Sequence, residues 1–166
     1  AWGVQIVFDN QVILGTRARK TRTKSFNAFS SIDYPETAMF RDRRLIQFLQ
    51  RPAEYTHAVF STALDPNVFV LRLVPGMRAD IIPMLEGRYR ALVLESFGVG
   101  GLPGGDDGAM FAAVRDWCGA GHLAVFTTQV PHEGSDLAVY EVGRAAKALP
   151  GVLEAHDMTP EATAVK

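Results

Sequence analysis

Alternating apolar residues at the start of the chain predict a strand, a turn and a second strand. Val4, Ile6 and Phe8 stand at every second position, which is the period of a strand with one buried face. Residues 9–11 (DNQ) interrupt this pattern, and the apolar run resumes at residues 12–14 (VIL). Two short apolar runs around a polar interruption are typical of a strand-turn-strand unit.

The long middle section, residues 16–67, has no clean helical or strand period. Short apolar pairs such as Met39-Phe40 and Phe48-Leu49 lie among charges and turn residues. A structureless loop of this length is uncommon inside a compact domain. We therefore expect residues 16–67 to be a connection between two domains, with one or two edge strands.

From Val68 onward, nearly continuous apolar runs alternate with helical periods. Runs that are apolar on both faces are typical of parallel strands covered by helices on both sides. The predicted strands are 68–74, 89–97, 122–128 and 152–156, and the predicted helices are 79–87, a helix from 109, and 137–149. The pattern predicts an α/β domain over residues 68–166, a small doubly wound (Rossmann- or flavodoxin-like) fold with roughly four parallel strands.

Helix-capping residues refine two of these boundaries. Asp106 or Asp107 is expected to cap the helix from residue 109. Near the end of the chain, Thr159 suits an N-cap and Pro160 suits the first helical position. That helix begins just before the sequence stops, and the sequence opens without Met at Ala1. We therefore expect this chain to be part of a longer protein.

Composition narrows the class of protein without defining its function. The 166 residues are 48% hydrophobic, enough for one substantial core, and the formal net charge is −1. No run of about 18 apolar residues predicts a membrane-spanning helix. Cys118 is the single cysteine, which rules out an internal disulfide and fits a reducing compartment. We expect neither nucleic acid nor membrane as a partner.

Five of the seventeen Lys and Arg residues fall between Arg17 and Lys24. If the chain stays extended here, Ala18 and Lys20 point to one side and Arg17 and Arg19 to the other. A lysine that acts as a base must be partly neutral, which requires desolvation or nearby positive charge. The pattern leaves three interpretations open: a solvated run, a phosphate-binding arm and a functional lysine.

A glycine-rich segment, GVGGLPGG (98–105), lies between a predicted strand and a predicted helix. Open α/β sheets bind ligands at such positions. The segment fails the dinucleotide fingerprint, because that pattern requires glycine where Pro103 stands. The alternatives are a flexible turn and a loop whose backbone, including Gly100 and Gly101, binds a small ligand's carboxylate or amide.

Other polar residues offer weaker candidates. Glu141 lies in the predicted helix 137–149 near the end of the third strand, where it is either a surface carboxylate or a binder of an α-amino group. The four histidines are scattered without metal-ligand spacing, so no metal or other cofactor is expected. His132 and Glu133 read as solvated loop residues, and Cys118 as a packed apolar side chain.

Several of these segments together resemble type I, cytoplasmic-type L-asparaginases. FDNQVILGTRARK followed by FNAFSS is similar to the part of that family in which a strand-turn-strand leads into Gly-x-Arg-x-x-Lys and Phe-x-Ala-Phe-x-Ser. LRLVPGM, LVLESFGVGGLP, FTTQV, YEVG and HDMTPEAT resemble elements of its C-terminal domain, in the same order. The resemblance covers essentially the whole chain. It implies that residues 1–25 are the last part of the family's N-terminal domain, residues 26–67 a linker with edge strands, and residues 68–166 most of its C-terminal domain.

The resemblance implies hydrolysis of L-asparagine by a threonine nucleophile through an acyl-enzyme, without a cofactor, and leaves glutamine open as an alternative substrate. Lys20 matches the lysine that activates the nucleophile or water, and Glu141 the glutamate that reaches a neighbouring subunit's site. Gly100 and Gly101 fall where a substrate-contacting asparagine often stands, and this chain lacks that asparagine. The family also implies a cytoplasmic homodimer or homotetramer.

The family's two threonine motifs, Thr-Gly-Gly-Thr and Gly-Thr-Asp-Thr, occur nowhere in these 166 residues. We therefore expect this chain alone to be inactive. Two further interpretations remain open: a non-catalytic module that binds a ligand or nucleic acid, and the asparaginase-like component of a tRNA-dependent amidotransferase.

Overall fold

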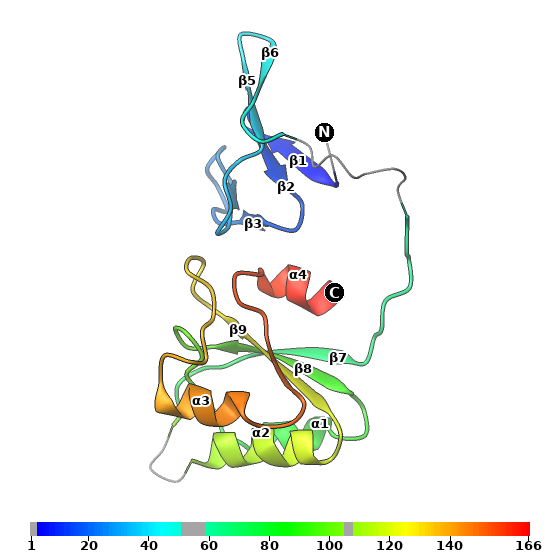
Figure 1. Cartoon of the computed structure of the whole chain (residues 1–166), viewed down its shortest axis with the longest axis vertical. Helices are drawn as coiled ribbons and strands as arrows, with labels where there is room; N and C mark the ends of the chain where they lie inside the picture. The colour runs from blue at the N-terminus through cyan, green and yellow to red at the C-terminus, as the bar shows by residue number, and fades with distance from the viewer. Residues whose placement is uncertain (1–2, 51–58, 105–107) are drawn as a thin grey trace. The chain divides into compact units, whose positions relative to one another are not determined.

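The computed structural model describes residues 3–50, 59–104 and 108–166 of the chain (Figure 1). Contacts between Cα atoms divide the chain into two compact units, with the boundary between Ala63 and Leu64. Each unit is described separately.

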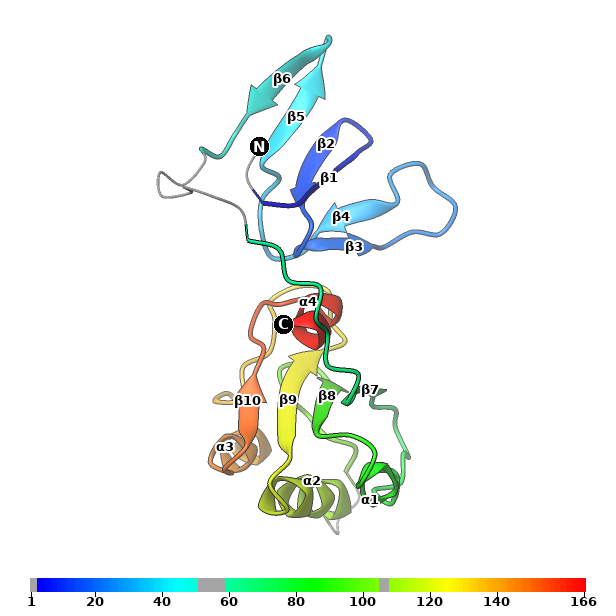
Figure 2. The ribbon, with the colours of Figure 1, turned by 90° about the vertical axis from the view of Figure 1, so that its right-hand side faces the viewer.

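The first unit is built from antiparallel strands. Its four-stranded sheet has the order β1-β2-β5-β6, and a separate two-stranded sheet pairs β3 with β4 (Figure 2). The strands are β1 Gln5–Phe8, β2 Gln11–Leu14, β3 Ala18–Lys20, β4 Phe29–Ser31, β5 Ala38–Arg41 and β6 Arg44–Gln47. The predicted strand-turn-strand at the start of the chain is confirmed as the β1-β2 hairpin.

Both hairpins of the four-stranded sheet turn through two residues with positive φ. These are Asp9 (48°) and Asn10 (61°) between β1 and β2, and Asp42 (49°) and Arg43 (61°) between β5 and β6. This backbone matches the right-handed twist of the flanking strands, and Asn and Asp tolerate it better than most residues. The polar DNQ interruption therefore marks a tight hairpin.

Residues 26–67, which we predicted as a linker with edge strands, contain three strands in the described part. β5 joins the sheet of the first hairpin by pairing with β2, and β4 pairs with β3. These strands accordingly belong to the same compact unit as the first hairpin, and that unit extends to Ala63. The predicted domain boundaries at 25/26 and 67/68 stay predictions.

The second unit is an α/β domain with four parallel strands in the order β10-β9-β8-β7. The strands are β7 Val68–Arg72, β8 Ala91–Ser96, β9 Leu123–Thr128 and β10 Val152–Glu154, and each lies within a predicted strand. The helices are α1 Ile81–Leu85, α2 Ala109–Gly119, α3 Glu141–Lys147 and α4 Pro160–Val165. The predicted fold class is confirmed.

Helices cover both faces of this sheet (Figure 1). The strands follow one another in sequence order, so right-handed crossovers place α1, α2 and α3 on the same face. The opposite face is covered by α4, which contacts β7, β8 and β9. The main core lies on the face of the three crossover helices, where Leu94, Phe126 and Val114 are fully buried.

Two helix starts differ from or refine the predictions. The helix predicted over 137–149 is shorter, because Tyr140 is extended (φ −111°) and α3 begins at Glu141. The N-cap of α2 is Gly108, in the left-handed region, and Asp106 and Asp107 lie outside the described residues. The predicted cap of α4 is confirmed: Thr159 Oγ1 accepts the Ala162 N–H at 3.1 Å.

Candidate functional site

Lys20 is the last residue of β3 and is exposed on the first unit. β3 pairs with β4, which places Lys20 opposite Phe29 and Arg19 opposite Ser30. The pairing keeps this segment extended, so alternation places Lys20 on the face opposite to Arg19. The backbone of Lys20 is thus held at the end of a paired strand, and its side chain is exposed.

Two arginines of the basic run engage groups of their own unit. The Arg17 guanidinium lies 5.4 Å from the centre of the Tyr34 ring. Arg22 Nη1 donates to the Asn27 carbonyl at 2.9 Å, across the β3-β4 connection. These contacts give the arginines local structural roles, so the cluster does not require a phosphate ligand to explain it.

The glycine-rich segment forms a tight turn closed by the Phe97 carbonyl. This oxygen accepts the N–H groups of Gly100 and Gly101 at 3.1 and 2.7 Å, and the Phe97 N–H donates to the Gly101 carbonyl at 2.9 Å. The two glycine N–H groups are therefore engaged within the turn. Because these two donors are already engaged, a ligand at this loop would contact other atoms on the outer surface of the turn.

Leu137 packs directly against this turn. A Cβ atom at Gly100 would overlap Leu137 Cδ2, and Gly100 has a φ of +148°, which L residues rarely adopt. The Asp136 N–H also donates to the Val99 carbonyl, at 2.8 Å. The turn and the segment leading into α3 are thus in contact through both side-chain packing and a backbone hydrogen bond.

Glu141 is the first residue of α3 and is exposed. It follows Leu137 by four positions, so Gly100, Gly101 and Glu141 belong to neighbouring elements of the second unit. Lys20 belongs to the first unit. The described geometry therefore contains two groups of predicted site residues, and their catalytic and binding roles stay predictions.

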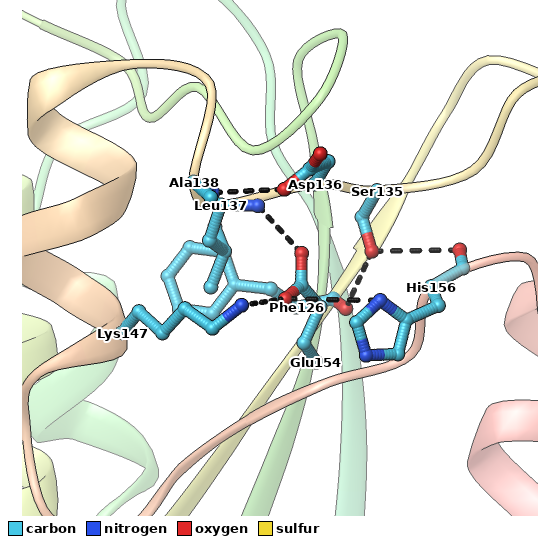
Figure 3. Close-up of polar contacts among 8 residues, drawn as sticks. All are labelled: Phe126, Ser135, Asp136, Leu137, Ala138, Lys147, Glu154 and His156. Atoms are coloured by element: carbon cyan, nitrogen blue, oxygen red, sulfur yellow. Dashed lines mark hydrogen bonds and ion pairs between the residues drawn. The ribbon is translucent and has the colours of Figure 1, made fainter.

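Glu154, at the end of β10, is a buried carboxylate that the sequence reasoning missed (Figure 3). Its side chain is only 6% exposed, and its Oε1 accepts the Leu137 N–H at 2.5 Å. Its Oε2 lies 3.0 Å from Lys147 Nζ and 3.8 Å from His156 Nδ1. Val152 and Glu154 share one strand face, and Val152 packs against the core. The sequence therefore did contain a signal for Glu154: it is a charged residue at a position where alternation with Val152 predicts a side chain that faces the core.

A polar contact beside Glu154 ties the chain before α3 to the chain after β10. The Ser135 N–H donates to the His156 carbonyl at 2.9 Å. A Cβ atom at Gly134, where φ is +70°, would lie 2.5 Å from the same oxygen. Only glycine fits this approach without movement of the backbone.

A separate open cavity of about 460 Å³ lies at the loops that follow β7 and β8. It is lined by Gly76, Met77, Arg78, Ala79, Asp80, Pro103, Gly104, Ala109 and Met110. None of the four predicted site residues lines it. The cavity lies at the edge of the sheet where open α/β sheets bind ligands. From the glycine-rich segment, the lining includes only Pro103 and Gly104.

The remaining candidates have structural roles or are solvated. Burial raises the pKa of the Cys118 thiol, so this side chain is a packed apolar group as predicted. His132 and Glu133 are exposed. Among the described residues, no group of three or more His, Cys, Asp or Glu side chains is placed to hold a metal ion. No helix in the described ranges is both long and apolar enough to cross a membrane.

Comparison with known proteins identifies relatives of both units. The family described as asparaginase, N-terminal, matches residues 1–54. The glutaminase/asparaginase C-terminal domain matches residues 67–166. The predicted resemblance to L-asparaginases is thereby confirmed.

Individual relatives include L-asparaginase from Thermococcus kodakarensis, which is 36% identical over 99% of this chain and 49% of that protein. The solved structure of the thermostable L-asparaginase from that organism superposes with a TM-score of 0.89 at 34% identity, covering 99% of this chain and 49% of the other. L-asparaginase 1 from Escherichia coli K12 is 30% identical over 98% of this chain and 48% of that protein.

A further relative is a component of the glutamyl-tRNA(Gln) amidotransferase of Metallosphaera sedula, 30% identical over 92% of this chain and 34% of that protein. This chain thus spans about half the length of the curated L-asparaginases that it matches, and less of the amidotransferase component. Because the C-terminal family model alone covers more than half of the sequence, the chain belongs to the glutaminase/asparaginase family.

Proposed function

We propose that this chain supplies the lysine and part of the substrate-binding surface of an L-asparaginase, which hydrolyses L-asparagine to L-aspartate and ammonia. The observation that carries the proposal is the order of the two family matches along one chain. Residues 1–54, which include Gly15, Arg17 and Lys20, match the N-terminal family, and residues 67–166 match the C-terminal one.

The proposed reaction divides into two steps. A threonine hydroxyl attacks the side-chain carboxamide carbon, its proton is passed to the amide nitrogen, and the C–N bond breaks so that ammonia leaves and an acyl-enzyme ester remains. Water then attacks the ester and releases aspartate. Lys20 is proposed to move the proton of the nucleophile or of the water. Strand pairing fixes the backbone from which this side chain projects, which supports the role because proton transfer depends on where the group is placed.

Substrate binding is assigned to the second unit. The exposed Glu141 carboxylate suits the α-amino group of the substrate, because opposite charges recognise each other at short range. Gly100 and Gly101 lie in the turn against which Leu137 packs, and their N–H groups donate to the Phe97 carbonyl. We further propose a cytoplasmic homodimer or homotetramer in which Glu141 serves a neighbouring subunit's site.

Ammonia release from asparagine tests this proposal. The 166-residue chain is expected to show no turnover, because it lacks both threonine motifs. A fusion that places the upstream part of a related L-asparaginase, with both threonine motifs, before this chain is expected to hydrolyse asparagine. Turnover by the 166 residues alone would contradict the requirement for the missing threonines, and a folded but inactive fusion would count against the proposed function.

Similarity to the amidotransferase component of Metallosphaera sedula favours a second candidate. In that case the same amide chemistry would act on a glutaminyl donor in a tRNA-dependent reaction. Ammonia release from glutamine that depends on glutamyl-tRNA would favour this candidate, whereas tRNA-independent release from asparagine would favour the first.

A further inference from the structure

The buried carboxylate of Glu154 joins three elements of the second unit. Glu154 ends β10, Leu137 lies in the segment before α3, and Lys147 ends α3. Figure 3 shows the carboxylate between the Leu137 N–H and the Lys147 ammonium, with the His156 ring on its other side. A carboxylate with 6% exposure must be compensated by such partners, because burial without them is costly.

The partners of Glu154 differ in burial and therefore in weight. The side chains of Lys147 and His156 are 50% and 67% exposed, so water screens the attraction between the Lys147 ammonium and the carboxylate and hydrates the imidazole. Leu137 is 1% exposed, and its N–H meets Oε1 at 2.5 Å. A hydrogen bond from a buried amide to a charged acceptor is the stronger kind. The bond to Leu137 is thus the main attachment.

Leu137 in turn contacts both elements assigned to substrate binding. Its Cδ2 occupies the space that a Cβ at Gly100 would need, and its carbonyl oxygen lies 2.5 Å from the position of a Cβ at Gly143 in α3. The neighbouring Asp136 adds the hydrogen bond to Val99. Any movement of Leu137 would therefore be transmitted to the glycine-rich turn and to the first turn of α3.

We propose that Glu154 is a positioning residue: through Leu137 it holds the glycine-rich turn and the start of α3, with Glu141, in a fixed relation. The inference rests on the proposed function for the importance of those two elements. Glu154 is given no contact with the substrate. Its carboxylate orients the segment from which the binding groups project.

Amide hydrogen exchange in the 166-residue protein, followed by NMR, tests the proposal. Glu154→Ala is expected to reduce the protection of the Leu137 and Asp136 amides at least ~10-fold, because the acceptor of the Leu137 N–H is lost. The amide of Leu94 in β8 is expected to keep its protection. Unchanged protection of Leu137 in this variant would overturn the proposal.

Two further variants separate the hydrogen bond from the ion pair and decide the question if Glu154→Ala unfolds. Glu154→Gln keeps an acceptor oxygen, so Leu137 is expected to stay protected within about 3-fold while its amide proton shifts upfield, because a neutral acceptor binds more weakly. Lys147→Met is the matched control and is expected to change neither. A Leu137 shift that appears in Lys147→Met but not in Glu154→Gln would overturn the assignment.

These results do not depend on catalysis, so they stand if the asparaginase assignment fails. In the fusion carrying the threonine motifs, Glu154→Ala is expected to raise the KM for asparagine, and Glu154→Gln to restore it to within about 3-fold of the original value. An unaltered KM in Glu154→Ala, in an enzyme that does hydrolyse asparagine, would contradict the positioning role. No turnover in the unsubstituted fusion would instead count against the proposed function.

Discussion

The two units bury their apolar side chains in different ways. In the second unit, Leu94 and Phe126 are 0% exposed, because helices cover both faces of the parallel sheet. In the first unit, Ile13 is 0% exposed, but Val7 and Leu45 on the same sheet are 58% and 55% exposed. Parallel strands reached through helical crossovers carry their own covering layers, whereas antiparallel hairpins of this kind leave a face open.

The difference matters for the proposed site. In the second unit, Gly100 lies in the turn that follows β8 and Glu141 begins α3, and both belong to a domain whose core is covered on both faces of the sheet. The first unit presents Lys20 from a three-residue strand paired with one other strand. Substitutions in each unit, measured in the whole chain, therefore test how strongly core packing supports the structure around the predicted site residues.

The largest expected change in stability comes from Phe126→Ala in β9. Removing a fully buried ring leaves a cavity, and losses of about 3–5 kcal/mol are usual for such a change. Leu45→Ala in β6 is the comparison in the first unit and is expected to cost less than about 1 kcal/mol, because more than half of its side chain is already exposed to water. Urea denaturation of both variants measures the difference. Equal losses would contradict the contrast between a closed and an open core.

A smaller effect is expected for Gly143→Ala in α3. Alanine is the better helix former by about 1 kcal/mol, but its Cβ would lie 2.5 Å from the Leu137 carbonyl oxygen. We expect a net loss of about 1–3 kcal/mol from overpacking. Gly119→Ala at the end of α2 meets nothing within 4 Å and is expected to be neutral or stabilising. The midpoint of thermal unfolding should therefore fall for Gly143→Ala and stay unchanged or rise for Gly119→Ala. Stabilisation by Gly143→Ala would show that the contact with Leu137 is loose.

The smallest effect concerns Asp65, an exposed residue near the start of the second unit. The Asn67 backbone N–H, the Asn67 side chain and Arg90 all stabilise its charged form, so its pKa lies below the usual value. A carboxyl with a lower pKa in the folded state contributes stability above its unfolded pKa, about 3.9. That contribution is lost as the pH falls through the folded pKa.

Asp65→Asn is therefore expected to be slightly less stable than the original protein near pH 7 and to match it at acidic pH. Arg90→Gln is expected to have a smaller effect, because the Asn67 N–H is the larger cause of the lowered pKa. Urea denaturation across this pH range measures both. A difference for Asp65→Asn that grew as the pH fell would contradict the assigned direction.

Hydrophobic patterning was sufficient to predict the second unit. Its strands are continuous apolar runs and α2 shows one apolar face, so both signals are local. The first unit was harder, because β4, β5 and β6 are three or four residues long and β6 is exposed throughout. Their pairing depends on partners distant in sequence, and no short window of residues contains that information.

The candidate site was predictable only through motifs. The Gly-x-Arg-x-x-Lys motif identified Lys20 as the candidate catalytic lysine. The charge pattern alone had left three interpretations of the basic run open. Glu154 shows the opposite case: it lies in none of the segments that resemble the family, and its role arises from the Leu137 N–H seventeen positions earlier in the chain. The start of α3 was also predicted at the wrong residue. Polar contacts keep residues 135–138 outside the helix, but the hydrophobic period does not change where the helix begins, so the pattern did not reveal this.

The most direct test of the proposed chemistry is the turnover number of the threonine-supplied fusion after Lys20→Met. We expect kcat for asparagine to fall by several orders of magnitude with little change in the unfolding free energy, because Lys20 is exposed and moves the proton in the proposed reaction. Lys24→Met removes the same charge four positions away and should leave kcat within about 3-fold. Retained activity in Lys20→Met, or an equal loss in Lys24→Met, would contradict the assignment of Lys20.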